Sequence, residues 1–360
     1  MKIEENVSLA DYTTLKVGGV ARYFVRLTDV ADVSLVVEFA RDKKLPLLVL
    51  GGGSNILVSD GVIDRVVVKN ELKGITFTKS HDGSVLVTAA AGEAWDAFVE
   101  KTVAQELSGL ENLLGVPGTV GASPVQNINC YGVSVADVIE SAMVFDAKSG
   151  ETRKLCNEEC LFGYRDSIFK HAAGARLVVV AVTFRLVPAV VANLSYRSSS
   201  QSIERYLREK GVAKPTVADV REAILHVRGN IGMLEGQFRS AGSFFKNTIV
   251  NAVDFARIEK VVHDRFNEIG ERFTPWHWVL PSGEVKVATG FLLECTPYNK
   301  STYGEKRWRD VVGLSPRHSL SIVTEAGATA ADVHDFANLI IASVYETFGV
   351  TIESEVNFVT

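Results

Sequence analysis

The sequence predicts an α+β protein of two or three domains. Its 360 residues are too many for one ordinary hydrophobic core. Strand-like apolar runs alternate with short helical patterns in the first half, and two glycine-rich segments lie among them, at 51–55 and 115–132. Apolar residues make up 47% of the chain and charged residues 22%, which is typical of a folded globular protein.

The first half supplies most of the expected strands. Alternating or continuous apolar runs predict strands at 21–27, 47–50, 56–69 with a turn at Asp60-Gly61, and 85–91. Helical spacing predicts two helices, at 30–43 with Val33, Val36, Val37 and Ala40 on one face, and at 93–105 with Trp95, Phe98 and Val99 on one face.

The second half is expected to be richer in helices. Strands are predicted at 142–146, 177–186 and 350–359, a charged helical stretch at 199–225, and a loop at 229–240. The clearest helix is 330–348, which has a continuous apolar face and Gly349 as its C-terminal stop. The composition changes at 187–192, beside Pro188, which indicates a domain boundary.

Charge and cysteine content exclude several classes of protein. A net charge of −5 favours neither nucleic acid nor an anionic membrane as a partner. The acidic start, residues 1–11, lacks the apolar core of a signal peptide, and no apolar run approaches the roughly 20 residues of a membrane span. Four cysteines without a metal-binding pattern indicate reduced thiols, no metal site and a cytoplasmic protein.

The segment Gly51-Gly52-Gly53-Ser54-Asn55 follows a strand, as a phosphate-binding loop would. It opens into the strand-like run at 56–58, whereas a dinucleotide-binding Rossmann turn opens into a helix, and the P-loop pattern is absent. Successive unhindered N–H groups can still form an anion site without a helix. A plain glycine-rich turn between two strands is the alternative.

The second segment, 115–132, packs four glycines and two prolines into 18 residues. We expect it to form no regular element and to bring backbone close to a flat ring system. Two such loops, each flanked by strands, are consistent with one large ligand that contacts both. FAD fits this description, with its pyrophosphate on the first loop and its isoalloxazine near the second.

Six motifs in order resemble the UDP-N-acetylenolpyruvoylglucosamine reductase family over about 13–359, nearly the whole chain. They are Leu50-Gly51-Gly52-Gly53-Ser54-Asn55, Val116-Pro117-Gly118-Thr119-Val120-Gly121, Gln126-Asn127-Ile128, Phe162-Gly163-Tyr164-Arg165-Asp166-Ser167, Ala241-Gly242-Ser243-Phe244-Phe245-Lys246-Asn247 and Glu353-Ser354-Glu355-Val356. The first two occur in many flavin oxidases and reductases of this FAD-binding fold. The tyrosine–arginine and Ser-Phe-Phe-Lys-Asn motifs are far more specific.

This resemblance implies an FAD-binding domain of the PCMH/vanillyl-alcohol-oxidase-like type, made of two α+β subdomains at 1–70 and 71–192. It also implies a C-terminal α+β substrate-binding domain at 193–360 whose last strand returns to the active site. The implied reaction is the NADPH-dependent reduction of UDP-N-acetyl-3-O-(1-carboxyvinyl)-glucosamine to UDP-N-acetylmuramate, in peptidoglycan precursor synthesis, with non-covalent FAD. The stretch at 194–197 resembles the tyrosine loop of one subclass.

The resemblance assigns three catalytic residues. Arg165 matches the group that stabilises negative charge in the substrate carboxylate, which suits a planar and permanently charged guanidinium. Ser243 matches the proton donor, and Glu355 matches an acidic partner, which helps only if it is protonated or acts through an intermediary. Alternatives remain: Ser243 as a turn serine, Arg165 as an ion-pair partner of Asp166, and Glu353 in place of Glu355.

Further contacts are implied for the cofactor and the substrate. The residues expected to bind the cofactor are Gly51, Gly52, Gly53, Ser54, Asn55, Pro117, Gly118, Gly121, Ser123, Asn127, Ile128, Tyr131 and Gly132. Those expected to bind the substrate are Tyr164, Tyr196, Arg228, Lys246 and Asn247.

The chain departs from the family pattern in three places. Asn129-Cys130 replaces a glycine–alanine pair, Ile231 and Met233 stand where a lysine and prolines are usual, and 295–310 is charged and aromatic instead of glycine-rich. A phosphate contact could therefore be lost or moved to Arg239. The remaining alternatives are an oxidase or dehydrogenase of the same fold acting on an alcohol or sugar, and a catalytically silent binder of FAD or UDP-sugars.

Overall fold

The computed structural model describes residues 1–188, 194 and 202–360, and these form two compact units. Each unit is assembled from segments that are far apart in the sequence. Unit 1 comprises Met1–Val7, Val20–Gly53 and Val62–Asn230, and unit 2 comprises Ser8–Gly19, Ser54–Gly61 and Ile231–Thr360. Unit 1 extends to Asn230, because the helices up to that residue share a hydrophobic core with the first half of the chain.

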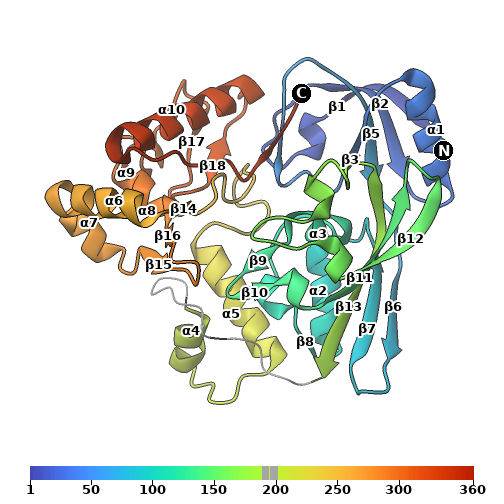
Figure 1. The fold of residues 1–360 in the computed structure, drawn as a ribbon, viewed down its shortest axis with the longest axis horizontal. Coiled ribbons are helices and arrows are strands. Elements are labelled where there is room, and N and C mark those ends of the chain that lie inside the picture. Colours follow the sequence, from blue (N-terminus) through green and yellow to red (C-terminus); the bar gives the residue numbers. More distant parts are fainter. Residues whose placement is uncertain (189–193, 195–201) are drawn as a thin grey trace. The chain divides into compact units, whose positions relative to one another are not determined.

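Unit 1 begins with a four-stranded sheet in the order β1-β2-β5-β3, with helix α1 (Asp32–Lys43) against one face (Figure 1). Strand β5 runs parallel to both β2 and β3. The four predicted inward residues of α1 are buried, so the helical spacing is confirmed. The strands are β1 (Ile3–Ser8), β2 (Val20–Leu27), β3 (Leu47–Leu50) and β5 (Val62–Asn70).

A second, antiparallel sheet follows in the order β12-β11-β13-β7-β6, with β8 paired to the end of β13. Its long central strand is buried on both faces. Val178 and Val180 pack in the core that contains α1, whereas Val179 and Val182 pack in the core that contains α2 (Trp95–Ala104). The continuous apolar run of β13 thus separates two cores. The strands are β6 (Ile75–Lys79), β7 (Val85–Ala90), β8 (Leu107–Ser108), β11 (Ile139–Asp146), β12 (Glu151–Cys156) and β13 (Leu177–Pro188).

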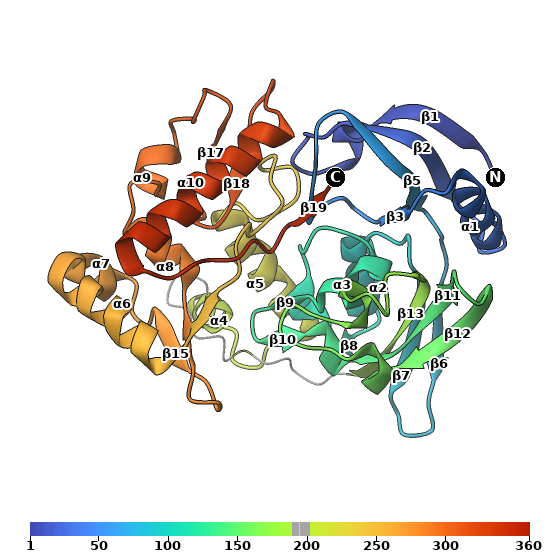
Figure 2. The same cartoon turned by 45° about the horizontal axis from the view of Figure 1, so that its top comes forward.

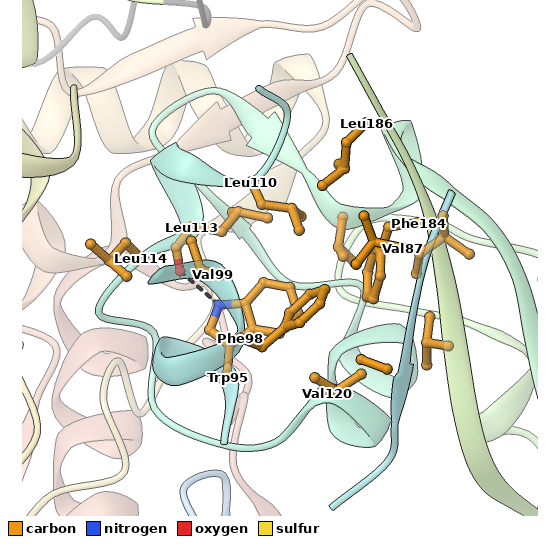
Figure 3. Packing of buried hydrophobic residues seen from close by; sticks show 14 of the residues in the cluster. Val87, Trp95, Phe98, Val99, Leu110, Leu113, Leu114, Val120, Phe184 and Leu186 are labelled. Carbon is orange, nitrogen blue, oxygen red and sulfur yellow. Dashed lines mark hydrogen bonds between the residues drawn. The ribbon is translucent and has the colours of Figure 1, made fainter. Parts of the chain in front are cut away.

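Aromatic side chains of α2 fill the larger core (Figure 3). Trp95 and Phe98 lie against Phe184 of β13, with ring centroids 6.0 and 5.0 Å away. The indole Nε1 of Trp95 donates a hydrogen bond to the Leu113 carbonyl oxygen at 2.8 Å, so its polar atom is satisfied inside the core. The predicted inward face of this helix is confirmed.

The helical stretch expected at 199–225 is two helices where it is described, α4 (Ile203–Glu209) and α5 (Val217–Asn230). Gly211, at φ 74°, and Pro215 interrupt it. Proline disfavours helical backbone at the residue before it, so one continuous helix was the wrong prediction. Buried residues of both helices, including Leu207 and Val220, join the core around α2.

Unit 2 is built around helix α10 (Ala330–Phe348), which packs on the hairpin of β17 (Val312–Leu314) and β18 (Ile322–Thr324) (Figure 2). Its other elements include the sheet β14-β16-β15, the parallel pair β19-β4 and the α-helices α6 to α9. These elements are β4 (Ile56–Val58), β14 (Thr248–Val250), β15 (His277–Val279), β16 (Val285–Val287), β19 (Asn357–Val359), α6 (Ala252–Arg265), α7 (Asn267–Arg272), α8 (Thr289–Glu294) and α9 (Lys300–Tyr303).

Both ends of α10 are capped. The sequence predicts the C-terminal cap, and the structure adds an N-terminal one. Gly349 adopts the left-handed conformation at φ 70°, and Thr329 with Asp332 forms a capping box at the start. In addition, the Asp60 carboxylate accepts hydrogen bonds from the N–H groups of Ala330 and Ala331, each at 3.0 Å. This carboxylate therefore ties the 54–61 segment to the helix of unit 2.

The strand expected at 350–359 is shorter in the structure. Only β19, at Asn357–Val359, forms a ladder, in parallel with β4. The preceding residues make backbone hydrogen bonds to another segment instead, from Lys246 N to Glu353 O at 3.0 Å and from Glu355 N to Phe244 O at 2.8 Å. Within the part of the chain described, no helix is long and apolar enough to cross a membrane.

Replacing Asp60 with alanine removes the acceptor for two N–H groups in the first turn of α10. We expect the free energy of unfolding to fall by about 1–2 kcal/mol, the usual cost of losing a helix cap. Urea denaturation followed by tryptophan fluorescence measures this loss, since Trp276, Trp278 and Trp308 lie in unit 2. The matched control is Asp64→Ala, which breaks an exposed ion pair with Arg22 and should change stability by less than about 0.5 kcal/mol. Equal effects of the two substitutions would contradict the capping role.

Candidate active site

The two glycine-rich loops touch each other through their backbones in unit 1. A Cβ atom on Gly52 would lie 2.7 Å from the Cα atom of Gly118, and one on Gly51 would lie 2.6 Å from Oγ1 of Thr119. Gly53 adopts the left-handed conformation at φ 65°. Side chains at these positions would force the loops apart, so the glycines are needed for close approach of the chain to itself.

The second loop is anchored at the start of α2. Trp95 N donates to Gly118 O at 3.0 Å, and Val120 N donates to Glu93 O at 2.9 Å. Gly121 N donates to Ala91 O at 2.9 Å, and a Cβ atom on Gly121 would lie 2.5 Å from that of Ala91. The part of the loop from Gly118 to Gly121 is therefore held by main-chain bonds.

The same loop contains short regular elements that the sequence did not predict. Residues Val120–Ala122 form a 3-10 turn, Ser123–Gln126 a single helical turn (α3), and Asn129–Cys130 strand β9. Ser123 is buried, and its hydroxyl donates to Val120 O at 2.8 Å. Pro124 is tolerated because it stands in the first turn of a helix.

Asn127 fastens this loop to two other segments. It has a left-handed backbone, with φ 44°, and its Oδ1 atom accepts bonds from Ser134 Oγ at 2.7 Å and Ala136 N at 3.2 Å. Its Nδ2 atom donates to Gly163 O at 2.8 Å. Tyr131 is also left-handed and buried. The Asn127 side chain thus shapes the loop that the sequence expected to contact the cofactor.

Arg165 lies on a tight turn that is attached to the second glycine loop. Backbone bonds between Gly163 and Asp166, of 2.9 and 3.3 Å, close the turn and hold Arg165 at φ 53°. This left-handed backbone is unfavourable for an arginine by about 1–2 kcal/mol, so the surrounding bonds must maintain it. Ser167 Oγ donates to Val125 O at 2.7 Å, which adds a second link to the loop.

The far side of the turn is braced by charged groups. Lys170 Nζ donates to Arg165 O at 3.0 Å, and His171 Nε2 lies 2.8 Å from Asp166 Oδ2. Burial raises the pKa of Asp166, but the His171 bond and the Ser167 N–H outweigh it, and the net pKa lies below the ordinary value. Asp166 therefore pairs with His171.

Arg228 is buried, with 4% of its surface exposed, and lies beside the second glycine loop. Its Nη1 atom is 3.5 Å from Sγ of Cys130. The departure at Asn129-Cys130 thus places a thiol against this guanidinium, where the family pattern has alanine. The expected phosphate contact of Arg228 stays a prediction.

In unit 2, backbone pairing brings the Ser243 and Glu355 segments together. Phe244, next to Ser243, donates from its N–H to Leu320 O at 2.8 Å and accepts at its carbonyl from Glu355 N, also at 2.8 Å. Asn55 Nδ2 donates to Glu355 O at 3.2 Å. The segments that contain Ser243 and Glu355 are therefore neighbours, although the two residues are 112 positions apart in the sequence.

The two glutamates of the last motif differ in their surroundings. Glu353 has an exposed side chain and pairs with Lys246, with 3.1 Å between Oε2 and Nζ. Glu355 is half-buried beside Phe244. The ion pair with Lys246 disfavours the alternative in which Glu353 takes the acidic role. The substrate contact expected of Lys246 stays a prediction, and it requires Lys246 to leave this ion pair.

Asn247 and the buried Thr289 stabilise the end of the same motif. Asn247 Oδ1 accepts from Thr289 N at 3.2 Å, and Thr289 Oγ1 donates to Lys246 O at 2.7 Å. Tyr164 lies on the Arg165 turn with 46% of its surface exposed. Tyr196 lies outside the described residues. The departure residue Arg239 is exposed and its carbonyl accepts from Thr324 N at 3.0 Å.

One charged residue beside the glycine loops was missed by the sequence analysis. Lys69 ends the apolar run of β5, and its ammonium donates to the carbonyl oxygen of Gly51. A lysine that closes an otherwise apolar strand next to a glycine loop is a signal that could have drawn attention to it.

Comparison with known proteins follows the same division of the chain. Residues 21–155 match the family model described as FAD binding domain, and residues 234–359 match that of the UDP-N-acetylenolpyruvoylglucosamine reductase C-terminal domain. The chain is 36% identical to the UDP-N-acetylenolpyruvoylglucosamine reductase of Pseudomonas aeruginosa over 358 residues, which is 99% of each chain. It is 36% identical to that of Thermobifida fusca over 354 residues, 97% of this chain and 96% of the relative.

A solved structure shares the fold over the whole chain. The crystal structure of the UDP-N-acetylenolpyruvylglucosamine reductase from Thermus caldophilus covers 100% of both chains with a TM-score of 0.62 and 24% sequence identity. The glycine loops of unit 1 fit a bound dinucleotide in their chemistry, because successive glycines carry N–H groups without side chains and a lysine ammonium lies at the Gly51 carbonyl.

Substituting Gly52 with alanine tests whether the loop-to-loop contact is needed for cofactor binding. Its backbone is not left-handed, so the added methyl group meets a steric conflict with Gly118 only. Overpacking of this kind costs about 1–3 kcal/mol, which corresponds to roughly tenfold or greater loss of FAD affinity if the loops separate. Fluorescence titration of the cofactor-free protein with FAD measures it.

The control for this substitution is Gly290→Ala, in helix α8, where the nearest atom would lie 3.5 Å from the new methyl group. It should leave FAD affinity unchanged. Wild-type affinity in the Gly52→Ala protein would show that the loops tolerate separation and would refute the steric argument.

Proposed function

The chain belongs to the UDP-N-acetylenolpyruvoylglucosamine reductase family, and on this premise we propose which of its residues carry out the family's reaction. It is an FAD-dependent oxidoreductase that uses NADPH to reduce UDP-N-acetyl-3-O-(1-carboxyvinyl)-glucosamine to UDP-N-acetylmuramate, in peptidoglycan precursor synthesis. The observation that carries this conclusion is the identity to curated relatives along the full length of the chain.

The two glycine loops of unit 1 are proposed to hold FAD. Gly51, Gly52 and Gly53 offer backbone N–H groups to its diphosphate, and Ser54 and Asn55 extend that loop. The second loop offers backbone to the flavin ring through the positions Pro117, Gly118, Gly121, Ser123, Asn127, Ile128, Tyr131 and Gly132. When bound and reduced by NADPH, the cofactor would supply the hydride for the substrate double bond.

Arg165 is proposed to stabilise the negative charge that spreads into the substrate carboxylate. A guanidinium presents two N–H groups in a fork that matches a carboxylate, and its charge does not depend on pH in the physiological range. The turn at Gly163–Asp166 is closed by backbone bonds and braced by Lys170, so the arginine backbone is held in place before substrate arrives. Such preorganisation is what makes electrostatic stabilisation effective.

Ser243 is proposed to deliver the proton to the carbon next to the one that receives the hydride. Its hydroxyl is a weak acid, so its effect depends on position and on the charge stabilisation that Arg165 provides. Glu355 is proposed as the acidic partner, because its segment pairs with that of Ser243 and its competitor Glu353 is engaged by Lys246. Hydride and proton together complete the reduction of the double bond.

The UDP-sugar is proposed to contact Tyr164, Tyr196, Arg228, Lys246 and Asn247. Lys246 can exchange its exposed partner Glu353 for a phosphate at little cost, because a solvent-exposed ion pair contributes only about 0–1 kcal/mol. We retain 1–70 and 71–192 as the proposed cofactor subdomains and 193–360 as the proposed substrate domain. The four free cysteines are consistent with a proposed cytoplasmic location.

Replacing Ser243 with alanine separates cofactor reduction from substrate reduction. The purified variant should be yellow and should be bleached by NADPH at the wild-type rate, because the hydroxyl has no part in accepting hydride from NADPH. Recovery of colour on addition of the enolpyruvyl substrate should slow by about 10²–10⁴-fold, the usual contribution of a positioned proton donor. Stopped-flow absorbance at the flavin band measures both steps.

The control is Ser282→Ala, in an exposed turn where the serine bonds only Glu284 and its N–H group. It should reoxidise like the wild type. If Ser243→Ala also recovers its colour at the wild-type rate, Ser243 is not the proton donor. If the reduced wild-type enzyme ignores the substrate, the reaction itself is misassigned.

A further inference from the structure

Lys69 of unit 1 is a charged residue in a partly buried position, and burial of a charge is energetically unfavourable. It stands between the buried residues Val68 and Asn70 near the end of β5 and is itself only partly exposed. In the parallel pairing of β3 with β5, Leu50 is its direct neighbour. The carboxyl ends of these two strands therefore meet where the chain leaves β3 for Gly51, and such sheet edges are where open α/β sheets bind ligands.

The ammonium of Lys69 donates to the carbonyl oxygen of Gly51, the first residue of the glycine loop. It makes no ion pair within 4.0 Å with any acid in the described part of the chain. The two other cations of this edge do: Arg26 lies 2.9 Å from Glu71, and Lys73 lies 3.6 Å from Glu93. Of these three cations, Lys69 is the one whose partner in the described part of the chain is a neutral carbonyl oxygen instead of a carboxylate.

The free-energy cost of burying the Lys69 ammonium is reflected in its pKa. Burial lowers the pKa of the Lys69 ammonium below its usual value of 10.5, Glu71 opposes this change, and the charges of Lys73 and Arg26 add to it. A partly buried cation without an ionised partner is destabilising unless an anion is supplied from outside. Groups of this kind concentrate at functional sites.

We propose that Lys69 is a positioning residue for the cofactor. Its ammonium binds the Gly51 carbonyl and supplies the positive charge that the FAD diphosphate meets at the first glycine loop. The carbonyl oxygen of Gly51 carries partial negative charge, which would repel a phosphate. An ammonium bonded to it neutralises this charge and leaves the N–H groups of the loop to the anion. The inference rests on the FAD binding stated under the proposed function.

The groups packed against the loop supply no charge. Where Cβ atoms of Gly51 and Gly52 would lie, the nearest residues are Thr119, Ala122 and Gly118, which are uncharged. The chain as a whole has a net charge of −5, so the diphosphate gains no general attraction from the protein. A local cation is therefore worth most at this loop, where partial burial weakens screening by salt.

The test compares three variants of the cofactor-free protein by fluorescence titration with FAD. Lys69→Met removes the charge and the donor while keeping the length of the side chain, and should raise the dissociation constant of FAD by about 10- to 100-fold, as expected for loss of a charge-assisted bond. Lys69→Arg keeps the charge and should stay within about threefold of wild type. Lys73→Met is the matched control, because Lys73 also donates to a glycine carbonyl, that of Gly92, and should bind FAD like the wild type.

A second measurement separates cofactor positioning from a purely structural role. Urea denaturation of the cofactor-free proteins should show Lys69→Met to be as stable as wild type or more stable, because a costly charge is removed. Because burial lowers the pKa of Lys69 from the usual 10.5, wild-type FAD affinity should also fall as the pH rises toward 10.5 and the ammonium deprotonates, and Lys69→Met should lack this fall. The charged groups that act on Lys69 are Glu71, Lys73 and Arg26, and Lys73→Met controls for the second lysine.

Two results would overturn the proposal. One is an unchanged FAD dissociation constant in Lys69→Met. The other is a loss of affinity that accompanies an equal loss of stability in the cofactor-free protein, without any change in pH dependence. Both results concern cofactor binding alone, so they are distinguishable from failure of the substrate to reoxidise the reduced enzyme.

Discussion

The backbone contact between Gly52 and Gly118 is the constraint on which the cofactor half of the protein depends. It requires glycine at position 52, because a methyl group there would overlap the chain at Gly118, and Gly118 has a φ of 136°, which favours glycine. It also joins the first sheet of unit 1, which feeds the loop through β3, to the start of α2, which holds the second loop by main-chain bonds. The glycines thus serve packing of the chain as well as access of a ligand to its backbone.

The second loop is in turn bonded to the turn that carries Arg165. Asn127 bonds the turn at Gly163, and Ser167 returns a bond to Val125. Arg165 remains in a left-handed backbone because these links and the brace of Lys170 offset its conformational cost. A left-handed arginine in the motif on which the family resemblance rests is consistent with strain that is maintained for function.

Unit 2 gathers its motif residues by a different route. Segments from both ends of the chain are needed: Asp60 caps α10, Asn55 bonds Glu355, and Glu355 pairs with Phe244 next to Ser243. None of these links is local in sequence. Loss of the 54–61 segment would therefore affect both the main helix and the pairing that places the proposed acid beside the proposed proton donor.

The sequence by itself determined the helices α1 and α10, the strands β2, β3, β5, β7, β11 and β13 of unit 1, and the six motifs, because apolar periodicity, caps and motif order are local properties. It did not determine the division after Asn230, the interrupted helix at 203–230 or the short β19, because these depend on which core each segment joins and where its backbone bonds go. The ion pair of Glu353 with Lys246, and the bond of Lys69 to the Gly51 carbonyl, arise from contacts between residues distant in the chain. Only the tertiary structure brings such residues together, and so only it shows which charges are paired and which are left for a ligand.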